Sequence, residues 1–423
     1  MKALVLFGAG RNAAASFYMF SSDNWIPICI CDNDQSKINT QFVIDGFVLE
    51  VISPECVMKR YPDAAFYITP DPPQKFEIIE QLLNNNIDIS RILNYEPFCY
   101  LHSCDLIGKS INFTPTQLHH CCSASNGVKP PLICDFHGGG FPQNRYVDSV
   151  NKLISANNSE YSPCEGCRNF HEGYFSVQKF PINSISINSY MHCNLHCSYC
   201  RPSGWVKGQY GWWDMHESAV YSIADTLIGM YENKIISQST QINWGGGEPV
   251  LAKNFSDCMK MLAEKGIKQI INTNATIYSE SITEVLLSGL IQVQVSVDAG
   301  TPLTYFSVKG EDLYYSVWDT IAKYAKVNSS SITVKYIVIE ENSGEKDFLE
   351  FINQCDISGV KNIAITPEYN LLWRGHYSDS LVRKIIDLYL LLQKRGFITI
   401  LHTDYFSTEQ KDIIFNSING VEI

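Results

Sequence analysis

The chain has 423 residues, of which 45% are hydrophobic, so we expect two or three domains with ample buried core. Its formal net charge of −12 disfavours general nucleic-acid binding, because the phosphate backbone repels an acidic protein. Its apolar runs fall short of the ~20 residues that a membrane-spanning helix needs, and the first run, at residues 3–7, leads into a glycine turn as a strand does. We therefore expect a cytoplasmic protein with no membrane partner.

Residues 1–105 are expected to form the first domain. Apolar runs at 3–7, 27–32, 47–56 and 64–69 alternate with helix-like segments, which is typical of a parallel sheet covered by helices. The first strand ends at Gly8-Ala9-Gly10, the start of a dinucleotide-type turn, and the second ends at Asp32, where a ribose-binding acid is expected.

Residues 28–55 of this domain resemble Rossmann-like domains of sugar-modifying and nucleotide-sugar proteins. The resemblance implies a bound nucleotide, a bound nucleotide sugar or a docking role. Gly8, Gly10 and Asp32 are then the candidate nucleotide-binding residues. A structural or partner-docking domain that binds no cofactor is the alternative.

Residues 106–180 are expected to form a loop-rich cysteine module. Gly, Pro, Asn, Ser, His and Cys dominate it, and its hydrophobic periodicity is weak. In a reducing compartment, clustered cysteines more often bind metal than form disulfides. A second iron–sulfur cluster, a zinc ion and no metal at all remain the three alternatives here. The candidate auxiliary metal ligands are Cys121, Cys122, Cys134, Cys164 and Cys167.

Residues 181–423 return to alternating strands and helices. The predicted strands span 184–189, 241–246, 268–274, 291–298, 332–340 and 362–369. These strand–helix units predict a partial (β/α)6 barrel, so the whole chain is of the α/β class. In such barrels the functional residues collect at the carboxyl ends of the strands.

Cys193, Cys197 and Cys200 follow the first of these strands with spacings of three and two residues. Cysteine thiolates are the usual protein ligands of iron–sulfur clusters. Three thiolates on one loop can hold three irons of a four-iron cluster and leave the fourth iron open to a ligand, as an open zinc position does. A closed zinc site, the alternative, would need a distant fourth ligand.

The segment CNLHCSYC resembles the signature of the radical S-adenosylmethionine (SAM) superfamily, C-x3-C-x-aromatic-C, with Tyr199 at the aromatic position. The resemblance implies a 4Fe-4S cluster whose open iron binds SAM. It also implies an oxygen-sensitive enzyme that cleaves SAM with an electron from a donor such as flavodoxin or ferredoxin. The resulting 5′-deoxyadenosyl radical would abstract a hydrogen atom from the substrate.

Three later strand ends carry motifs that resemble the SAM-binding positions of this superfamily. The glycine-rich one implies contact with the SAM amino group, and the polar ones imply contact with its ribose and carboxylate. Ordinary turns and caps are the alternative for each motif alone. Lys335, on the fifth strand, is a further polar residue of open role. The candidate SAM-binding residues are Tyr199, Gly245, Gly246, Gly247, Glu248, Thr273, Asn274, Ser296 and Asp298.

The cysteine module resembles SPASM or twitch modules, which normally follow the barrel and here would precede it. That resemblance implies a peptide substrate, whereas the first domain implies a sugar or nucleotide sugar. We therefore predict hydrogen abstraction from one of these substrates, with no catalytic side chain assigned. The competing hypotheses are a non-catalytic iron–sulfur or zinc protein for electron transfer or docking, and a nicotinamide-dependent oxidoreductase with a structural metal.

Overall fold

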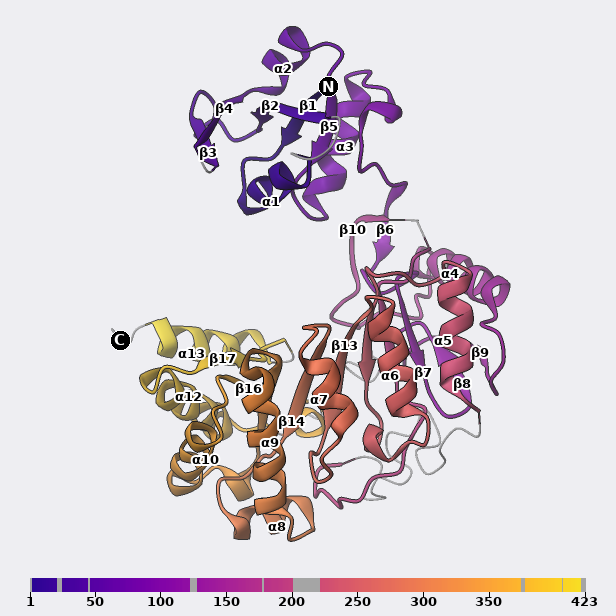
Figure 1. Ribbon diagram of the computed structural model, residues 1–423. Coiled ribbons are helices and arrows are strands. Elements are labelled where there is room, and N and C mark those ends of the chain that lie inside the picture. The colour runs from indigo at the N-terminus through magenta and orange to yellow at the C-terminus, as the bar shows by residue number, and fades with distance from the viewer. Residues whose placement is uncertain are drawn as a thin grey trace. The chain divides into compact units, whose positions relative to one another are not determined.

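The computed structural model describes residues 2–20, 25–44, 46–121, 128–176, 179–200, 221–373, 377–404 and 406–419. The chain divides into two compact units, which Figure 1 shows from the amino to the carboxyl end. The smaller unit comprises Met1–Asp105 and Asn169–Gln178, and the larger one comprises Leu106–Arg168 and Lys179–Ile423.

The smaller unit contains a five-stranded sheet in the order β3-β4-β2-β1-β5. Strands β4, β2, β1 and β5 are parallel, and β3 pairs with β4 in the antiparallel sense. After Lys2, β1 is an apolar run because both faces of the sheet are covered: Leu4, Val5 and Leu6 are fully buried. The strands are β1 (Lys2–Phe7), β2 (Trp25–Cys31), β3 (Gln41–Ile44), β4 (Phe47–Ile52) and β5 (Ala65–Ile68).

Helices and a separate ribbon complete this unit. The ribbon pairs β6 (Phe98–Ser103) with β10 (His171–Ser176) in the antiparallel sense, so part of the segment 106–180, predicted to be the cysteine module, belongs to the smaller unit. The helical segments are α1 (Arg11–Phe20), α2 (Pro54–Arg60), α3 (Gln74–Asn84) and the short η1 (Ile89–Arg91).

The larger unit contains a ten-stranded sheet in the order β17-β16-β15-β14-β13-β12-β11-β7-β8-β9. Neighbours from β17 to β7 are parallel, and β8 and β9 extend the sheet in the antiparallel sense. The α/β class with parallel sheets is therefore confirmed. The strands are β7 (Ser110–Phe113), β8 (Gln117–His119), β9 (Leu132–Asp135), β11 (Ser184–Ile187), β12 (Gln241–Trp244), β13 (Lys268–Thr273), β14 (Ile291–Ser296), β15 (Ile332–Val338), β16 (Asn362–Pro367) and β17 (Ile398–Leu401).

Most of the segment 106–180, expected to form a module of its own, belongs to this larger unit, to which residues 106–168 contribute three strands and a helix. The physical reason lies in β7, whose four residues are all buried and which pairs with β11. Asn112 in this strand is fully buried and accepts a hydrogen bond from the Asn188 side chain at 2.8 Å. The four residues of β7 alternate between polar and apolar, but four is the shortest run in which alternation indicates a strand, so the signal is weak within a segment rich in Gly, Pro and Ser.

Helices pack on one face of this sheet and leave the other face polar. Along β14, Ile291, Val293 and Val295 are fully buried, whereas the residues between them are partly exposed. Tyr336 on β15 follows the same rule, since its hydroxyl donates to Asp347 of α10 (Glu345–Ile357) on the helical side. Lys335 therefore lies on the opposite, polar face, because successive strand residues alternate between faces.

Some helices of the larger unit begin at a residue whose side chain caps the first turn. α8, for example, starts after the cap Thr301 and ends at Gly310, which has a left-handed φ of 77°. Among the described residues, no helix is long and apolar enough to cross a membrane. The helices are α4 (Gln143–Asn157), α5 (Ile223–Glu232), α6 (Phe255–Glu264), α7 (Glu280–Leu286), α8 (Pro302–Lys309), α9 (Tyr314–Asn328), α10 (Glu345–Ile357), α11 (Tyr369–Trp373), α12 (Asp379–Lys394) and α13 (Thr408–Asn419), with the short segments η3 (Pro249–Leu251), η4 (Ser329–Ser331) and η5 (Glu340–Asn342).

Candidate radical SAM site

The predicted cluster ligands lie on the loop that follows β11, which we call the cysteine loop (residues 188–200). Cys193 is exposed, and Cys197 and Cys200 are partly buried. Met191 and Leu195 anchor the loop, because their side chains are only 7% and 5% exposed. The loop thus presents three thiols from the carboxyl end of a parallel strand.

Among the described residues, no three Cys, His, Asp or Glu side chains gather as they do around a single metal ion. The thiols that hold a four-iron cluster each bind a different iron. They therefore stand farther apart than the ligands of a single ion. One amide already points at the loop as a donor to sulfur: Asn274 Nδ2 lies 3.6 Å from Cys193 Sγ. A soft donor set with an N–H aimed at one sulfur suits an iron–sulfur cluster.

The glycine-rich turn after β12 is bound tightly to the cysteine loop. The backbone N–H of Gly247 donates to Tyr190 O at 2.7 Å, and that of Glu248 donates to His192 O at 2.7 Å. A Cβ at Gly247 would lie 2.1 Å from His192 O. We expected these glycines to let a ligand approach, but Gly247 is required first by the close approach of the cysteine loop.

Glu248 lies beneath this turn and is only 2% exposed. Its Oε1 accepts from the Thr273 hydroxyl at 2.8 Å and from Val250 N at 3.2 Å, and its Oε2 accepts from Asn274 N at 2.7 Å. Burial raises the pKa of Glu248, and these hydrogen bonds oppose the rise. The carboxylate therefore ties the end of β12 to the end of β13.

Asn274 joins the end of β13 to the cysteine loop. Its Nδ2 donates to Asn194 Oδ1 at 2.9 Å, in addition to the contact with Cys193. Its Oδ1 accepts from the Thr276 hydroxyl at 2.7 Å, and that hydroxyl accepts from Asn194 Nδ2 at 2.8 Å. Asn194 and Thr276 were not singled out from the sequence, where nothing distinguishes them from ordinary loop residues.

Asp298, after β14, is fully buried, and protein groups already bind both of its carboxylate oxygens. Oδ1 accepts from Ile337 N at 2.6 Å, and Oδ2 accepts from the Tyr199 hydroxyl and from Lys309 Nζ. Lys309 was not predicted, because it is a single lysine at the end of a helix. Tyr199 and Asp298, predicted as separate SAM contacts, thus meet in one buried group.

Ser296 and Lys335 are register partners on β14 and β15, and both lie on the polar face of the sheet. Lys335 is half-buried, and its ammonium makes no hydrogen bond or ion pair within the part of the chain that the structure describes. Burial lowers the pKa of Lys335, and the carboxylate of Asp298 partly offsets that effect. The polar face therefore holds a cation without a direct counter-charge among the described residues.

The candidate auxiliary ligands occupy two loops of residues 106–168 and strand β9. Cys134 lies on β9 and is half-buried, and Cys164 is buried in a turn shared with Cys167. Gly166 of this turn is left-handed, and a Cβ there would lie 3.8 Å from the Val128 side chain. The turn therefore lies beside the chain that follows the Cys121 loop. Cys122 falls outside the described residues.

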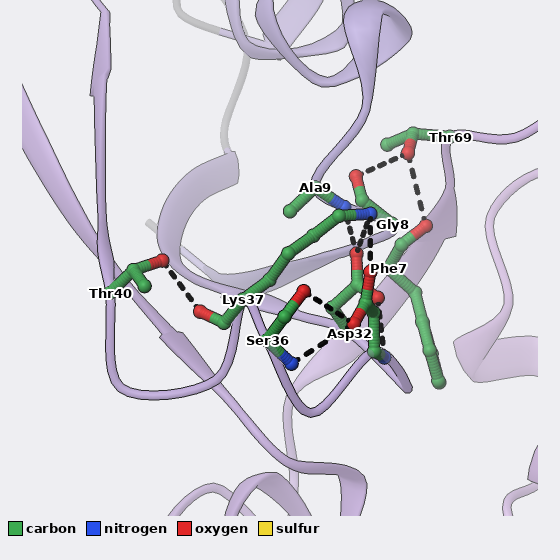
Figure 2. Close-up of polar contacts among 9 residues, drawn as sticks. Phe7, Gly8, Ala9, Asp32, Ser36, Lys37, Thr40 and Thr69 are labelled. Carbon is green, nitrogen blue, oxygen red and sulfur yellow. Dashed lines mark hydrogen bonds and ion pairs between the residues drawn. The ribbon is translucent and has the colours of Figure 1, made fainter.

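In the smaller unit, Asp32 forms hydrogen bonds that hold the predicted nucleotide turn in place (Figure 2). Asp32 accepts from Ala9 N at 2.6 Å and from Asp34 N at 2.8 Å, and Lys37 Nζ lies 3.5 Å from its Oδ2. Gly8 has a φ of 113°, and a Cβ there would lie 2.6 Å from Thr69 and Pro70.

Gly10 differs from Gly8, because a Cβ at Gly10 would meet no atom within 4 Å. The side of the turn at Gly10 is therefore open. On the other side of the turn, Gly8 and Asp32 are already in contact with residues of the same unit.

Comparison with known proteins identifies the family. Residues 187–353 match the family model described as the radical SAM superfamily, and this stretch contains all three predicted cluster cysteines and the strand-end motifs. This stretch of the chain is therefore a radical SAM domain. The prediction of a radical SAM enzyme is thereby confirmed at the level of the superfamily.

The curated relatives of this radical SAM protein include GTP 3′,8-cyclases. The one from Vibrio vulnificus (strain YJ016) is 26% identical over 221 residues, which cover 51% of this chain and 63% of the relative. The probable GTP 3′,8-cyclase of Methanocaldococcus jannaschii is 27% identical over 184 residues, which cover 43% and 58%. The chain therefore spans less than two thirds of the length of these relatives.

Among solved structures, Streptococcus suis SuiB bound to the precursor peptide SuiA aligns with a TM-score of 0.43 and 15% identity. That alignment covers 68% of this chain and 59% of SuiB. A structure of anSMEcpe with bound AdoMet aligns with a TM-score of 0.39 and 16% identity, covering 52% and 63%.

Proposed function

We propose that this chain binds a 4Fe-4S cluster through Cys193, Cys197 and Cys200, cleaves SAM reductively there, and abstracts a hydrogen atom from a substrate. One observation carries the proposal: the ends of β12 and β13 both converge by hydrogen bonds on the cysteine loop. When bound, the cluster would supply the electron that cleaves SAM. We also propose that the larger unit is a partial radical SAM barrel and the smaller unit is Rossmann-like.

The geometry divides the predicted SAM-binding residues into two groups. The polar side-chain atoms of Tyr199, Glu248, Thr273 and Asp298 are engaged within the protein, so we propose that these residues hold the site in shape. The Asn274 side chain is engaged in the same way, with Asn194 and Thr276. The exposed backbone at Gly246, with its neighbours Gly245 and Gly247, and the side chain of Ser296 are left to contact SAM. Such a site is preorganised, because contacts within the protein fix the orientation of the binding groups before the ligand binds.

Lys335 bears on which substrate class fits this site. Its ammonium lies on the polar face and forms no direct ion pair among the described residues, and a ligand anion would supply one. On the next strand and the same face, the buried hydroxyl of Thr366 has no hydrogen-bond partner within the described chain. We propose a negatively charged polar substrate. Of the two predicted classes, a peptide and a sugar or nucleotide sugar, this favours a nucleotide sugar, and the relatives named for GTP agree with it.

Replacing Lys335 by methionine is expected to weaken anion binding. A hydrogen bond to a charged group contributes about 1.5–3 kcal/mol, so the Kd of an anionic probe should rise about tenfold or more. The probes are GTP and a nucleoside diphosphate sugar, measured by calorimetry, and the matched control is Lys361→Met at an exposed lysine. A rise in the Kd of SAM alone would assign Lys335 to the SAM carboxylate and remove the argument for an anionic substrate.

We propose that the smaller unit has a structural or docking role. Asp32 is the residue that would bind a ribose, and its carboxylate already accepts the backbone N–H of Ala9 in the turn and that of Asp34 in the loop after β2. The second candidate role is nucleotide binding, because the side of the turn at Gly10 is open and a ligand could approach the backbone there. Calorimetry with NAD and with a nucleoside diphosphate sugar on the Gly10→Glu variant separates the two, because only nucleotide binding is sensitive to a carboxylate there.

The central proposal is tested by anaerobic reconstitution with iron and sulfide, reduction, and detection of methionine and 5′-deoxyadenosine from SAM. Cleavage of SAM supports a radical enzyme. Iron without SAM cleavage would favour an electron-transfer protein instead. We also propose a second metal site among Cys121, Cys134, Cys164 and Cys167, because the turn of Cys164 and Cys167 lies beside Val128, and the iron content per chain tests it.

A further inference from the structure

Helix α8 ends against the cysteine loop. The last carbonyls of a helix have no partner within it, and here the loop supplies the partners. His196 N donates to Lys309 O at 2.9 Å, and Ser198 N donates to Val308 O at 2.9 Å. A Cβ at Gly310 would lie 2.9 Å from His196 Cβ, so the helix end and the loop are in direct contact. The backbone between Cys193 and Cys200 is thus fixed from the α8 side.

The Lys309 side chain continues this contact beneath the loop. Its ammonium pairs with the Asp298 carboxylate and donates to the Tyr199 hydroxyl at 2.7 Å, while that hydroxyl donates to Asp298. The side chains of Lys309 and Asp298 are 2% and 0% exposed. Asp298 is held in turn by Ile337 N at 2.6 Å. The three polar groups satisfy one another in a buried position.

A buried ion pair is weak evidence for stability, because desolvation of the two charges offsets their attraction. Fixing a geometry is a better-attested use of such a pair. Here the geometry that is fixed is that of Tyr199, which lies between Cys197 and Cys200 in the sequence.

We infer that Lys309 is a positioning residue for the cluster: with Asp298 it locks the Tyr199 hydroxyl and so fixes the loop segment that carries Cys197 and Cys200. The inference rests on the proposed function, since it assumes that these cysteines hold the cluster. It also gives Asp298 a role that requires no contact with SAM. Loss of the lock would leave the cysteines in the chain but would loosen the geometry of the cluster and of its open iron.

The test compares the reconstituted full chain with Lys309→Met, Asp298→Asn, the double variant, and Tyr199→Phe. Lys323→Met serves as the matched control, since Lys323 forms an exposed pair with Asp319. Three readouts are needed: thermal stability, iron per chain, and the electron paramagnetic resonance spectrum of the reduced cluster with and without SAM. The spectrum reports on cluster geometry and would not respond to a purely structural role.

Lys309→Met should lose stability and about half or more of the bound iron, because Asp298 is left buried without its counter-charge. The double variant should regain stability, since neither charge remains, yet keep an altered spectrum and a weakened response to SAM. Tyr199→Phe should show the altered spectrum with little loss of stability.

Full recovery of the spectrum in the double variant would overturn the inference, and so would a native spectrum in Lys309→Met. Failure of the native chain to bind iron would contradict the proposed function instead.

Discussion

Replacing Cys193, Cys197 and Cys200 together by alanine is expected to abolish SAM cleavage. The three thiols are the ligands that the sequence motif and the convergence of two strand ends on one loop both single out. If a second cluster occupies the upstream cysteines, iron should fall from about eight to about four per chain. If the radical cluster is alone, iron should fall from about four to zero.

Exposed cysteines outside the site provide the control. Cys56 on α2 and Cys99 on β6 are both exposed, so Cys56→Ala and Cys99→Ala should leave iron content and SAM cleavage unchanged. A native chain that takes up no iron would contradict the proposed function. Retention of the full iron content in the triple variant would place the metal elsewhere in the chain.

Gly247→Ala should have the second-largest effect, a loss of SAM cleavage of about a hundredfold or more. The added Cβ would lie 2.1 Å from His192 O and 2.6 Å from Met191 C, both of which are backbone atoms of the cysteine loop. Overpacking a well-packed region costs about 1–3 kcal/mol when side chains can adjust, and backbone atoms adjust less easily. The loop must therefore shift, and its cysteines shift with it.

Gly229→Ala in helix α5 is the matched control, because a Cβ at Gly229 would meet no atom within 4 Å. Alanine is also the better helix former by about 1 kcal/mol, so this variant should be native or slightly more stable. Iron content, SAM cleavage and the circular dichroism melting curve are measured for both variants. Native activity in Gly247→Ala would show that the contact with His192 is not needed for the site.

The sequence predicted where the site lies better than how it is held together. Parallel strands bring their carboxyl ends to one edge, so residues after β11, β12 and β13 had to become neighbours. The partners of each side chain could not be predicted, because they depend on loop conformations. Glu248, for example, was expected to meet the ammonium of a ligand, and its oxygens instead accept from Thr273, Asn274 and Val250.

Lys309 left no sequence signal for a different reason. Lys309, at the end of helix α8, pairs with Asp298 after strand β14 and with Tyr199 of the cysteine loop. Nothing in the sequence around any one of these residues predicts the other two. Residues 106–168 show the same limit at the level of the fold. Strand β7 has four residues and buries Asn112 completely, so weak periodicity there did not indicate a loop.

The long-range anchoring of the cysteine loop has a consequence for protein synthesis. The contact between Lys309 and Tyr199 spans 110 residues, and the contact between Asn274 and Cys193 spans 81. At a synthesis rate of about 5–20 residues per second, the cysteines leave the ribosome roughly 5–20 s before the residues that enclose them. During that interval the thiols are open to oxygen and to stray metal ions, so the nascent chain requires a reducing environment even before any cluster is inserted.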